Sequence, residues 1–591
     1  MTLKPILAAA IAVSCFGQMP KQDSRNVVIP DTNTHYTMPA FKTRAEWETR
    51  AGHLRKQILS AAGLVPLPEK TPLNAQVFGR LDREGYSIEK VLLETLPGYY
   101  LGGNLYRPRG KQGKFPGVVS PHGHWSYGRL EHQPLGSIPA RGISLARQGF
   151  VVFAYDMVGY NDTLQTPHAF GDRREQLWGF GPLGLQLWNS IRAVDFLQSL
   201  PDVDAEKIGA TGASGGGTQT FLLSAVDDRL KYSAPVNMIS AIMQGGSPCE
   251  NAPNLRVGTF NVEIGALMAP RPMLMVSATG DWTKNTLREE YPAIRSIYEL
   301  YDKAEFVKSV QIDAPHNYNQ QSREAVYRFF SWSVLADPNA DEIKERSIHP
   351  EMPHNMLALH GRALPANALS YAGLFEQWIA SAKRQNEAIH EPSIMRERLA
   401  YALLAEQPER AVSEISGEHV LLGRPGKGDR VPGIYLRGAD PRGERIAALI
   451  VHPDGANAAR RSATAREAIG RGETVLAIDA FQTGSASAPR DRSGKFFLTF
   501  NQSDDANRVQ DILTAVEFLR ASGASRIRVA GLEKAAVWCL FAAALAKTPV
   551  ELTADLSAFR GDDSDFLAKF FVPGIERAGG LKAALALTAK R

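Results

Sequence analysis

Cysteine is scarce in this sequence, which has only Cys15, Cys249 and Cys539 in 591 residues. With Cys15 in a leader, the two remaining cysteines are too few for a disulfide framework and lack the spacing of zinc ligands. The formal net charge of +5 is small for this length, and no basic run carries interleaved aromatic residues. Nucleic acid is therefore not an expected partner.

No apolar run is long enough to suggest a membrane-spanning helix. The segment Ile6–Val13 follows Lys4 and is too short to cross a bilayer. It predicts a secretory signal over residues 1–17, and therefore a chain that is periplasmic, tethered to the outer membrane or secreted. Export could include a lipid anchor on Cys15, because Val13-Ser14-Cys15 resembles a lipoprotein cleavage box with Ala12 in place of the usual leucine. The alternative to export is a frayed cytoplasmic N-terminus.

The length of the chain predicts at least two large domains, since a single core seldom serves more than about 300 residues. A hydrophobic content of 44% and a charged content of 22% are ordinary for a globular protein. Changes of pattern divide the chain into a polar tether, a catalytic domain, a helical linker and a second domain. These parts are expected at residues 18–42, 43–340, 341–409 and 410–591.

After an expected helix over Thr43–Ala62, the first large domain has three expected strands, Asn74–Leu81, Tyr86–Thr95 and Tyr100–Arg107, separated by turns that contain glycine. Strands then alternate with helices, which predicts a mostly parallel sheet with helices on both faces. Reactive groups are expected at the carboxyl ends of such strands. The later strands are expected at Phe115–Ser120, Val151–Tyr155, Ile208–Thr211, Tyr232–Ile239, Pro272–Ser277 and Phe306–Ile312.

The segment Gly212–Gly216 fits the pattern G-x-S-x-G between a short apolar strand and a helix. At such a turn the backbone is strained, and the serine hydroxyl stands above the edge of the sheet. The first N–H groups of the following helix point to the same place. The pattern predicts that Ser214 is a nucleophile, the alternative being a glycine-rich turn that happens to contain a serine.

A serine nucleophile needs a base and a group that orients the base. In the α/β-hydrolase order an acid and then a histidine follow later strands. Asp281 and His316 occupy these places, and we predict that His316 is the general base and acid and Asp281 its orienting carboxylate. Asp313, close to His316, is the alternative acid.

The turn Pro121–Trp125 follows an expected strand and has the sequence PHGHW. In this position the backbone N–H of His124 is expected to form an oxyanion hole with that of Gly215. The imidazoles of His122 and His124 suggest metal ligands, but no third ligand occurs at suitable spacing. A structural role or a substrate contact is expected instead, with no metal and no cofactor.

Five short sequence motifs resemble those of a known family. HGHW, YDMVGYND, GASGGGTQT, GDWTKNT and DAPHNYN begin at His122, Tyr155, Gly212, Gly280 and Asp313. They resemble bacterial α/β-hydrolases related to acetyl xylan esterases and other carbohydrate esterases. The resemblance covers about residues 43–335 and implies hydrolysis of an acetyl or methyl ester on a plant polysaccharide through an acyl-enzyme on Ser214.

The resemblance leaves the walls of the pocket to be inferred from the residues. The aromatic-rich segment Phe170–Trp188 and the loop Gln244–Asn251 are expected to wall it. Trp125 and Trp282 are candidates for stacking on a sugar ring, and buried packing is the alternative for each.

The second half repeats the outline of the first. Gly472–Asp479 has the pattern of Gly149–Asp156, but Glu533 stands where Ser214 stands. The final residues match the segment before the strand that carries Asp281. We therefore predict a truncated, non-catalytic α/β-hydrolase-like domain that packs against the first.

Two other functions remain open at this point. A serine peptidase of the prolyl-oligopeptidase type has the same order of catalytic residues, but it normally carries a β-propeller before the catalytic domain. Only about a hundred residues precede the PHGHW turn here. A non-catalytic binding protein of hydrolase fold is the other alternative.

Overall fold

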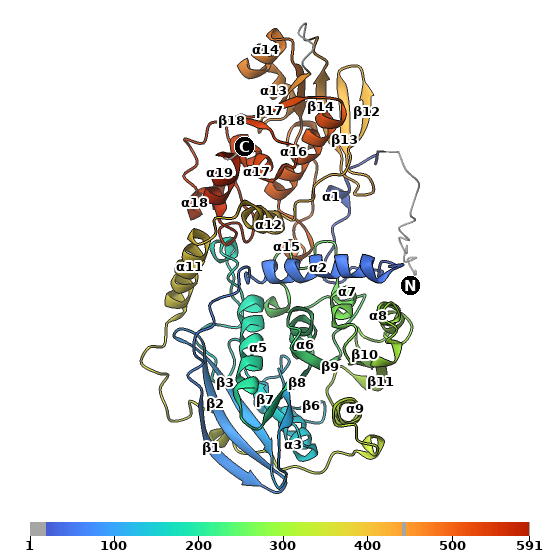
Figure 1. Ribbon diagram of the computed structural model, residues 1–591, viewed down its shortest axis with the longest axis vertical. Helices are drawn as coiled ribbons and strands as arrows, with labels where there is room; N and C mark the ends of the chain where they lie inside the picture. Colours follow the sequence, from blue (N-terminus) through green and yellow to red (C-terminus); the bar gives the residue numbers. More distant parts are fainter. Residues whose placement is uncertain (1–18, 440–444, 590–591) are drawn as a thin grey trace, which may run out of the picture.

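The computed structural model describes residues 19–439 and 445–589. Two sheets, each with its own helices, lie at opposite ends of the long axis, and helix α2 (Arg44–Ala61) crosses the region between them (Figure 1). No helix in these residues is long and apolar enough to cross a membrane. The predicted signal segment and Cys15 lie outside the described residues.

The first sheet has nine strands in the order β1-β2-β3-β7-β4-β8-β9-β10-β11. The pairs β1–β2, β2–β3 and β3–β7 are antiparallel, and every later pair is parallel. This confirms the predicted α/β-hydrolase fold. The strands are β1 (Gln76–Arg83), β2 (Tyr86–Leu96), β3 (Tyr99–Pro108), β4 (Phe115–Val119), β7 (Val151–Tyr155), β8 (Val203–Ala213), β9 (Leu230–Val236), β10 (Met273–Gly280) and β11 (Val307–Pro315).

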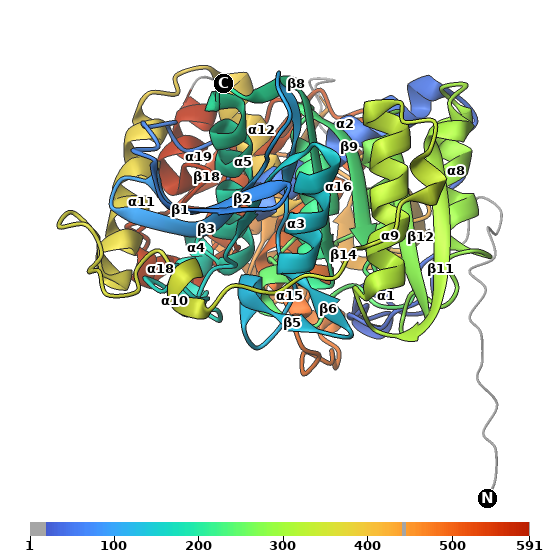
Figure 2. The ribbon, with the colours of Figure 1, turned by 90° about the horizontal axis from the view of Figure 1, so that it is seen from below.

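Helices cover both faces of this sheet (Figures 1 and 2). One face packs against α5 (Pro182–Ser199) and α6 (Gly215–Val226), and the other against α3 (Ile138–Gln148) and α9 (Gln320–Phe330). Local sequence sets the ends of α3, since the Ser137 side chain accepts a hydrogen bond from Ala140 N–H and Gly149 ends the helix at φ 118°.

The second sheet has the order β12-β13-β14-β16-β15-β17-β18. The order and the directions of its strands repeat those of β1-β2-β3-β7-β4-β8-β9, the first seven positions of the first sheet. No counterpart of β10 or β11 follows β18 in the residues that the structure describes. The strands are β12 (Val412–Ser416), β13 (His419–Gly423), β14 (Val431–Leu436), β15 (Ile446–Val451), β16 (Thr474–Ile478), β17 (Arg526–Gly531) and β18 (Glu551–Ala554).

One apolar cluster runs through both halves, from Trp47 of α2 to Leu587 of α19 (Gly580–Ala589). The helices α11 (Tyr371–Glu387) and α12 (Pro392–Leu403) belong to it and lie between the two sheets. In the second half, α17 (Ala535–Leu545) is apolar all round and buried along its whole length. The two halves therefore share a core.

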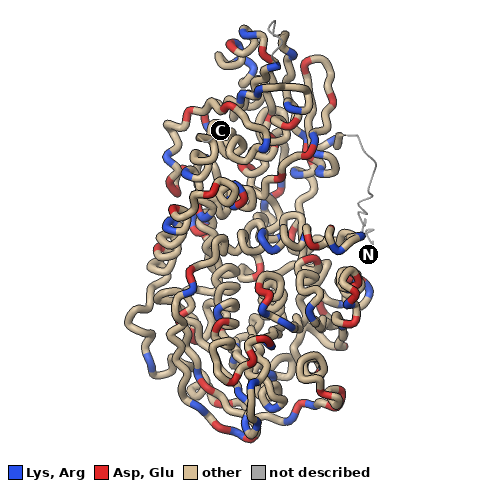
Figure 3. Tube along the Cα trace, in the orientation of Figure 1, with Lys and Arg blue, Asp and Glu red and all other residues tan. Residues whose placement is uncertain are grey.

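The segment 19–42, expected to be a tether, lies against both halves. Arg25 in α1 (Ser24–Val27) forms an ion pair with Asp511, 2.6 Å between Nη1 and Oδ1. Farther along, Gln244 N–H donates to Thr32 O. Lys and Arg are interspersed with Asp and Glu over both halves (Figure 3), and Arg174 pairs with Asp563 from one half to the other.

Candidate active site

Ser214 lies in the sharp turn between β8 and α6, with φ 59° and ψ −126°. Such a φ is unusual for a residue with a side chain, and strained residues of this kind cluster at functional sites. A side chain at Gly216 would collide with the backbone, because its Cβ would lie 2.7 Å from Pro121 O. Gly216, the last glycine of the motif, thus permits the close approach of the loop that follows β4.

Asp281 and His316, predicted from chain order, lie together at the ends of β10 and β11. His316 Nδ1 is 2.8 Å from Asp281 Oδ2, and the Asp281 side chain is only 2% exposed. Thr283 N–H donates to the other carboxylate oxygen over 2.7 Å. An ionised carboxylate only accepts, so Nδ1 carries the hydrogen and Nε2 presents a lone pair.

The alternative acid, Asp313, is exposed and faces elsewhere. Its Oδ1 accepts a hydrogen bond from Thr279 Oγ1 over 2.6 Å. Among the residues that the structure describes, no group bonds to His316 Nε2, although that atom is buried. No hydrogen bond joins it to Ser214 Oγ, and catalytic hydrogen bonds are often long before substrate binds.

The end of β9 connects the turn of Ser214 to the loop of His316. Ser214 N–H donates to Val236 O, and the side chain of the next residue, Asn237, donates to Asn317 O over 2.9 Å. Trp282 packs on the His316 ring with centroids 4.3 Å apart and donates from Nε1 to Asn237 O. Trp282 is therefore placed beside the imidazole, half-buried, where it can contact a substrate.

The PHGHW turn touches the turn of Ser214. A Cβ on Gly123 would lie 2.7 Å from Ala213 O and 3.1 Å from Ser214 Cβ. The N–H of His124 donates no hydrogen bond within the described chain, and Gly215 is the first residue of α6, whose N–H has no partner within the helix. The half-buried ring of Trp125 lies against Gly136 in the same region.

His122 has a structural role, because both of its ring nitrogens form hydrogen bonds inside the protein. The residue is fully buried, its Nε2 accepts from Met157 N–H over 2.9 Å, and its Nδ1 donates to Gly123 O over 2.7 Å. Burial lowers the pKa of His122 to about 3, so the ring stays neutral. With both ring nitrogens in hydrogen bonds, His122 braces the turn and offers no atom to a metal or a substrate.

Arg129 supports the same turn and was missed by the sequence analysis. Its guanidinium is fully buried, pairs with Asp156 and Asp162, and donates to Asn104 Oδ1 over 2.8 Å. Burial raises the pKa of Asp156 to about 6. The available signal was the pair of aspartates in YDMVGYND, whose burial requires a cation from elsewhere.

His124 lies in a second cluster. Its Nε2 is 3.2 Å from His168 Nε2 and 3.1 Å from Cys249 Sγ. His168 and Cys249 lie 44 and 125 positions away in the sequence, which is why spacing showed no third ligand. The ring of His124 also packs over Gly215, where an added Cβ would lie 2.6 Å from His124 Cε1.

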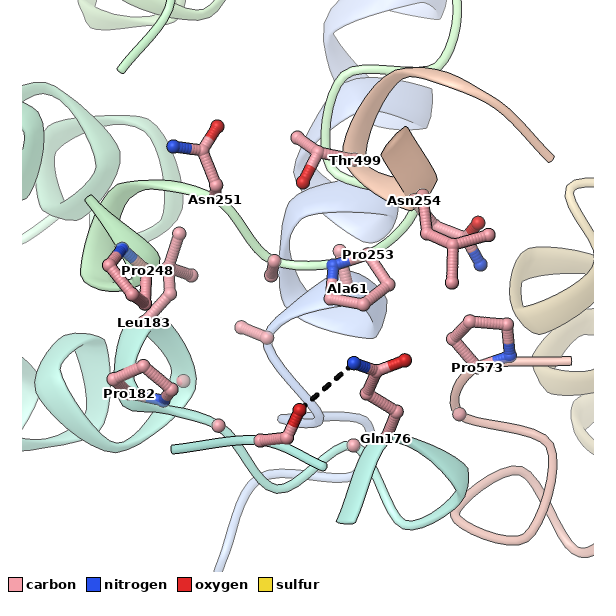
Figure 4. Close-up of a pocket in the computed structure, with 18 of the residues that line it drawn as sticks. Ala61, Gln176, Pro182, Leu183, Pro248, Asn251, Pro253, Asn254, Thr499 and Pro573 are labelled. Carbon is pink, nitrogen blue, oxygen red and sulfur yellow. Dashed lines mark hydrogen bonds between the residues drawn. The ribbon is translucent and has the colours of Figure 1, made fainter. Parts of the chain in front are cut away.

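The segments expected to wall the pocket border a cavity of about 410 Å³ between the two halves (Figure 4). Some residues of Phe170–Leu183 and of Pro248–Asn254 line the cavity. From the second half, Phe496–Thr499 lines it. Gln176, whose amide donates to Gly171 O over 2.9 Å, is one of the lining residues labelled in Figure 4. Ser214, Asp281 and His316 are not among its lining residues.

Hydrogen bonds join the two halves beside this cavity. Asn254 N–H donates to Leu498 O over 2.7 Å, and Arg256 N–H donates to Thr499 O over 2.9 Å. Lys495 Nζ donates to Gly246 O, also over 2.9 Å. These bonds hold the loop that carries Cys249.

None of the known protein-family models matches this chain. The chain is 27% identical over 248 residues to "Putative hydrolase YtaP" of Bacillus subtilis (strain 168), a match covering 38% of this chain and 80% of that protein. Among solved structures it is similar to "Methylesterase BT1017", with 32% identity, a TM-score of 0.50, and 58% of this chain and 78% of that chain covered. A "putative acetyl xylan esterase" from Bacteroides fragilis NCTC 9343 shares 15% identity at a TM-score of 0.40, with 59% and 91% covered.

The methylesterase match combines an identity of 32% with coverage of 78% of that chain. The sheet order and the parallel pairing from β7 to β11 agree with it. On these grounds the chain belongs to a family of esterase-related α/β-hydrolases.

Proposed function

We propose that this protein is a serine esterase that hydrolyses small esters, methyl or acetyl, on plant polysaccharides through an acyl-enzyme on Ser214. The observation that carries the proposal is the hydrogen bond from His316 Nδ1 to Asp281 Oδ2. It leaves a buried, unpaired Nε2 on the base, at the sheet edge where Ser214 occupies a strained turn. This is the combination that activates a serine hydroxyl.

In the proposed reaction His316 Nε2 takes the proton of Ser214 Oγ as this oxygen attacks the ester carbonyl carbon. The N–H groups of His124 and Gly215 stabilise the negative charge on the carbonyl oxygen. His316 then gives the proton to the leaving alcohol, and the C–O bond of the ester breaks. Water, activated by the same imidazole, hydrolyses the acyl-enzyme and restores Ser214.

The two ester classes differ in what leaves first. From a methyl ester of a uronic acid, methanol leaves and the polysaccharide remains bound to Ser214. From an acetylated sugar, the polysaccharide leaves and acetate remains bound. Similarity to a methylesterase at 32% identity favours the methyl ester for this chain. A polysaccharide substrate is also in keeping with the predicted export.

The test is hydrolysis of methyl-esterified pectin, acetylated xylan and 4-nitrophenyl acetate, with methanol and acetate quantified separately. The wild type, Ser214→Ala and the control Ser126→Ala, an exposed serine beside the PHGHW turn, are compared. We expect methanol release from pectin that is lost only in Ser214→Ala, with thermal unfolding unchanged.

Acetate release without methanol would move the substrate to acetyl esters. Activity that survives Ser214→Ala would contradict the mechanism. Cleavage of peptides but of none of these esters would favour the peptidase.

A further inference from the structure

Three atoms that bind transition metals converge beside Ser214: His124 Nε2, His168 Nε2 and Cys249 Sγ. They all lie within 4.8 Å of one another. Two of the separations are 3.2 and 3.1 Å. Ligand bonds of about 2.0–2.3 Å in tetrahedral zinc sites place neighbouring ligand atoms roughly 3.3–3.6 Å apart, close to these values.

The fold brings these atoms together from three loops at the carboxyl edge of the first sheet. His124 follows β4, His168 lies between β7 and α4 (Arg173–Leu177), and Cys249 lies in the short helix η2 (Pro248–Glu250) after β9. Sequence proximity therefore cannot explain the cluster. A common ligand would join the three loops at one point.

Ser247 Oγ lies 3.3 Å from His168 Nε2 and accepts a long hydrogen bond from Cys249 Sγ over 3.6 Å, but hydrogen bonds alone do not require three such atoms to converge. His168 Nδ1 donates to Val158 O over 2.7 Å, so its Nε2 carries a lone pair and no hydrogen. His124 Nε2 carries at most one hydrogen, and it faces both His168 Nε2 and Cys249 Sγ. A cation at their centre would bind all three, and the bond from His168 to a backbone carbonyl is the usual second partner of a metal-binding imidazole.

Hydrogen bonds place the loop that carries Cys249, and a buried carboxylate lies next to the cluster. The Glu250 carboxylate, next to Cys249 and only 4% exposed, accepts hydrogen bonds from the N–H groups of Gly246 and Ser247 over 2.9 and 3.0 Å. Lys495 of the second half fixes the same loop through Gly246 O. Ser247 Oγ lies 3.3 Å from His168 Nε2 and is a nearby candidate for the fourth ligand atom.

We infer that His124, His168 and Cys249 form a site for a divalent transition-metal ion of the zinc type, which ties three loops of the proposed active site together. The two imidazoles bind through Nε2, and Cys249 binds as the thiolate, its proton passing to solvent. Water or Ser247 Oγ completes a tetrahedron. Two nitrogens and a sulfur select zinc, cobalt or copper over magnesium or calcium.

The site is tested on the full chain, freed of metal with a chelator and titrated with Co²⁺. We expect one Co²⁺ per chain, with visible absorption of a tetrahedral site and a near-ultraviolet thiolate-to-cobalt band, both displaced by Zn²⁺. Cys249→Ala should abolish the thiolate band, and His168→Ala should weaken Co²⁺ binding at least tenfold. The matched control is Cys539→Ala, which removes the second buried thiol of the described residues and should keep the band.

Thermal unfolding supplies a readout that does not depend on activity. A ligand that binds only the folded protein raises the melting temperature, so Zn²⁺ should raise it in the wild type and in Cys539→Ala. The rise should be smaller in Cys249→Ala and in His168→Ala at the same Zn²⁺ concentration. A Co²⁺ band that persists in Cys249→Ala, or no stoichiometric binding by the wild type, would overturn the inference, whatever the esterase assays show.

Discussion

His316 donates its Nδ1 hydrogen to Asp281 across 2.8 Å, while Asp313, only three residues away in the sequence, bonds to Thr279. Position along the sequence therefore does not decide which acid orients the imidazole. The strand ends decide it, because Gly280 pairs with Pro315 and sets the two loops side by side. This geometry distinguishes two carboxylates that the sequence alone left as alternatives.

The first prediction concerns Asp281. Asp281→Asn should lower kcat by roughly 10³–10⁴-fold with little change in KM, because an amide no longer holds the hydrogen on Nδ1 or stabilises the imidazolium. Steady-state kinetics measure kcat and KM of Asp281→Asn, with the ester that the wild type is found to hydrolyse as substrate.

Asp313→Asn is the matched control and should leave kcat within about twofold, because its carboxylate contacts Thr279 rather than the imidazole. If Asp313→Asn were the more damaging change, the assignment of the orienting acid would be wrong.

Much of the fold could be predicted because its signals lie in residues that are close together in the sequence. The strand before Ser214, the glycines around it and the following helix are consecutive in the sequence, and the strand–helix alternation needs no long-range information. The second sheet could be predicted because Gly472–Asp479 repeats a pattern of the first. Boundaries were less exact: β8 begins at Val203 rather than Ile208, because its polar start pairs with Phe115 and Pro116 of β4.

The parts that could not be predicted depend on partners distant in the sequence. Arg129 has no local feature that marks it as a buried cation, since Asp156 and Asp162 approach it only in the folded chain. Cys249 reaches His124 across 125 positions. Residues 19–42 looked like a tether because their partners, such as Asp511, belong to the other end of the chain.

The second prediction concerns the buried charges that support the PHGHW turn. Arg129→Met should destabilise the protein by about 3–5 kcal/mol, because it leaves two buried carboxylates without a cation. Thermal or denaturant unfolding measures the loss. Adding Asp156→Asn and Asp162→Asn to Arg129→Met should restore part of it, which a purely steric effect of the arginine would not allow.

The control for Arg129 is Arg109→Met, since the Arg109–Asp82 pair is 3.5 Å long and exposed on both sides. Its loss should cost less than about 1 kcal/mol. Equal losses at the two arginines would contradict the role given to burial.

The third prediction is a pH dependence at the boundary between the halves. Burial, with Asp563 nearby, raises the pKa of Glu576 to about 8. Between the unfolded pKa of about 4.3 and this value the folded chain keeps a proton that the unfolded chain has lost, so stability falls as pH rises through this window. Glu576→Gln cannot ionise and should therefore melt several degrees above the wild type at pH 9, and at the same temperature near pH 4.

Glu387→Gln is the control for this window, because Glu387 is exposed in the same boundary region. It should shift the melting temperature equally little at both pH values. A difference between Glu576→Gln and the wild type that does not change with pH would exclude Glu576 as the titrating group.

The last prediction concerns the second turn. Glu533 has φ 49°, close to the 59° of Ser214, so the strained backbone persists without the hydroxyl. His452 Nε2 lies 3.7 Å from Glu533, but His452 Nδ1 accepts a hydrogen bond from Asp454 N–H over 3.0 Å. The neutral ring therefore carries its hydrogen on Nε2, which cannot take a proton from a neighbouring hydroxyl.

Adding Glu533→Ser to Ser214→Ala should restore no ester hydrolysis, and Glu533→Ser alone should retain wild-type activity. Recovered turnover in the double variant would show that the second half can support catalysis.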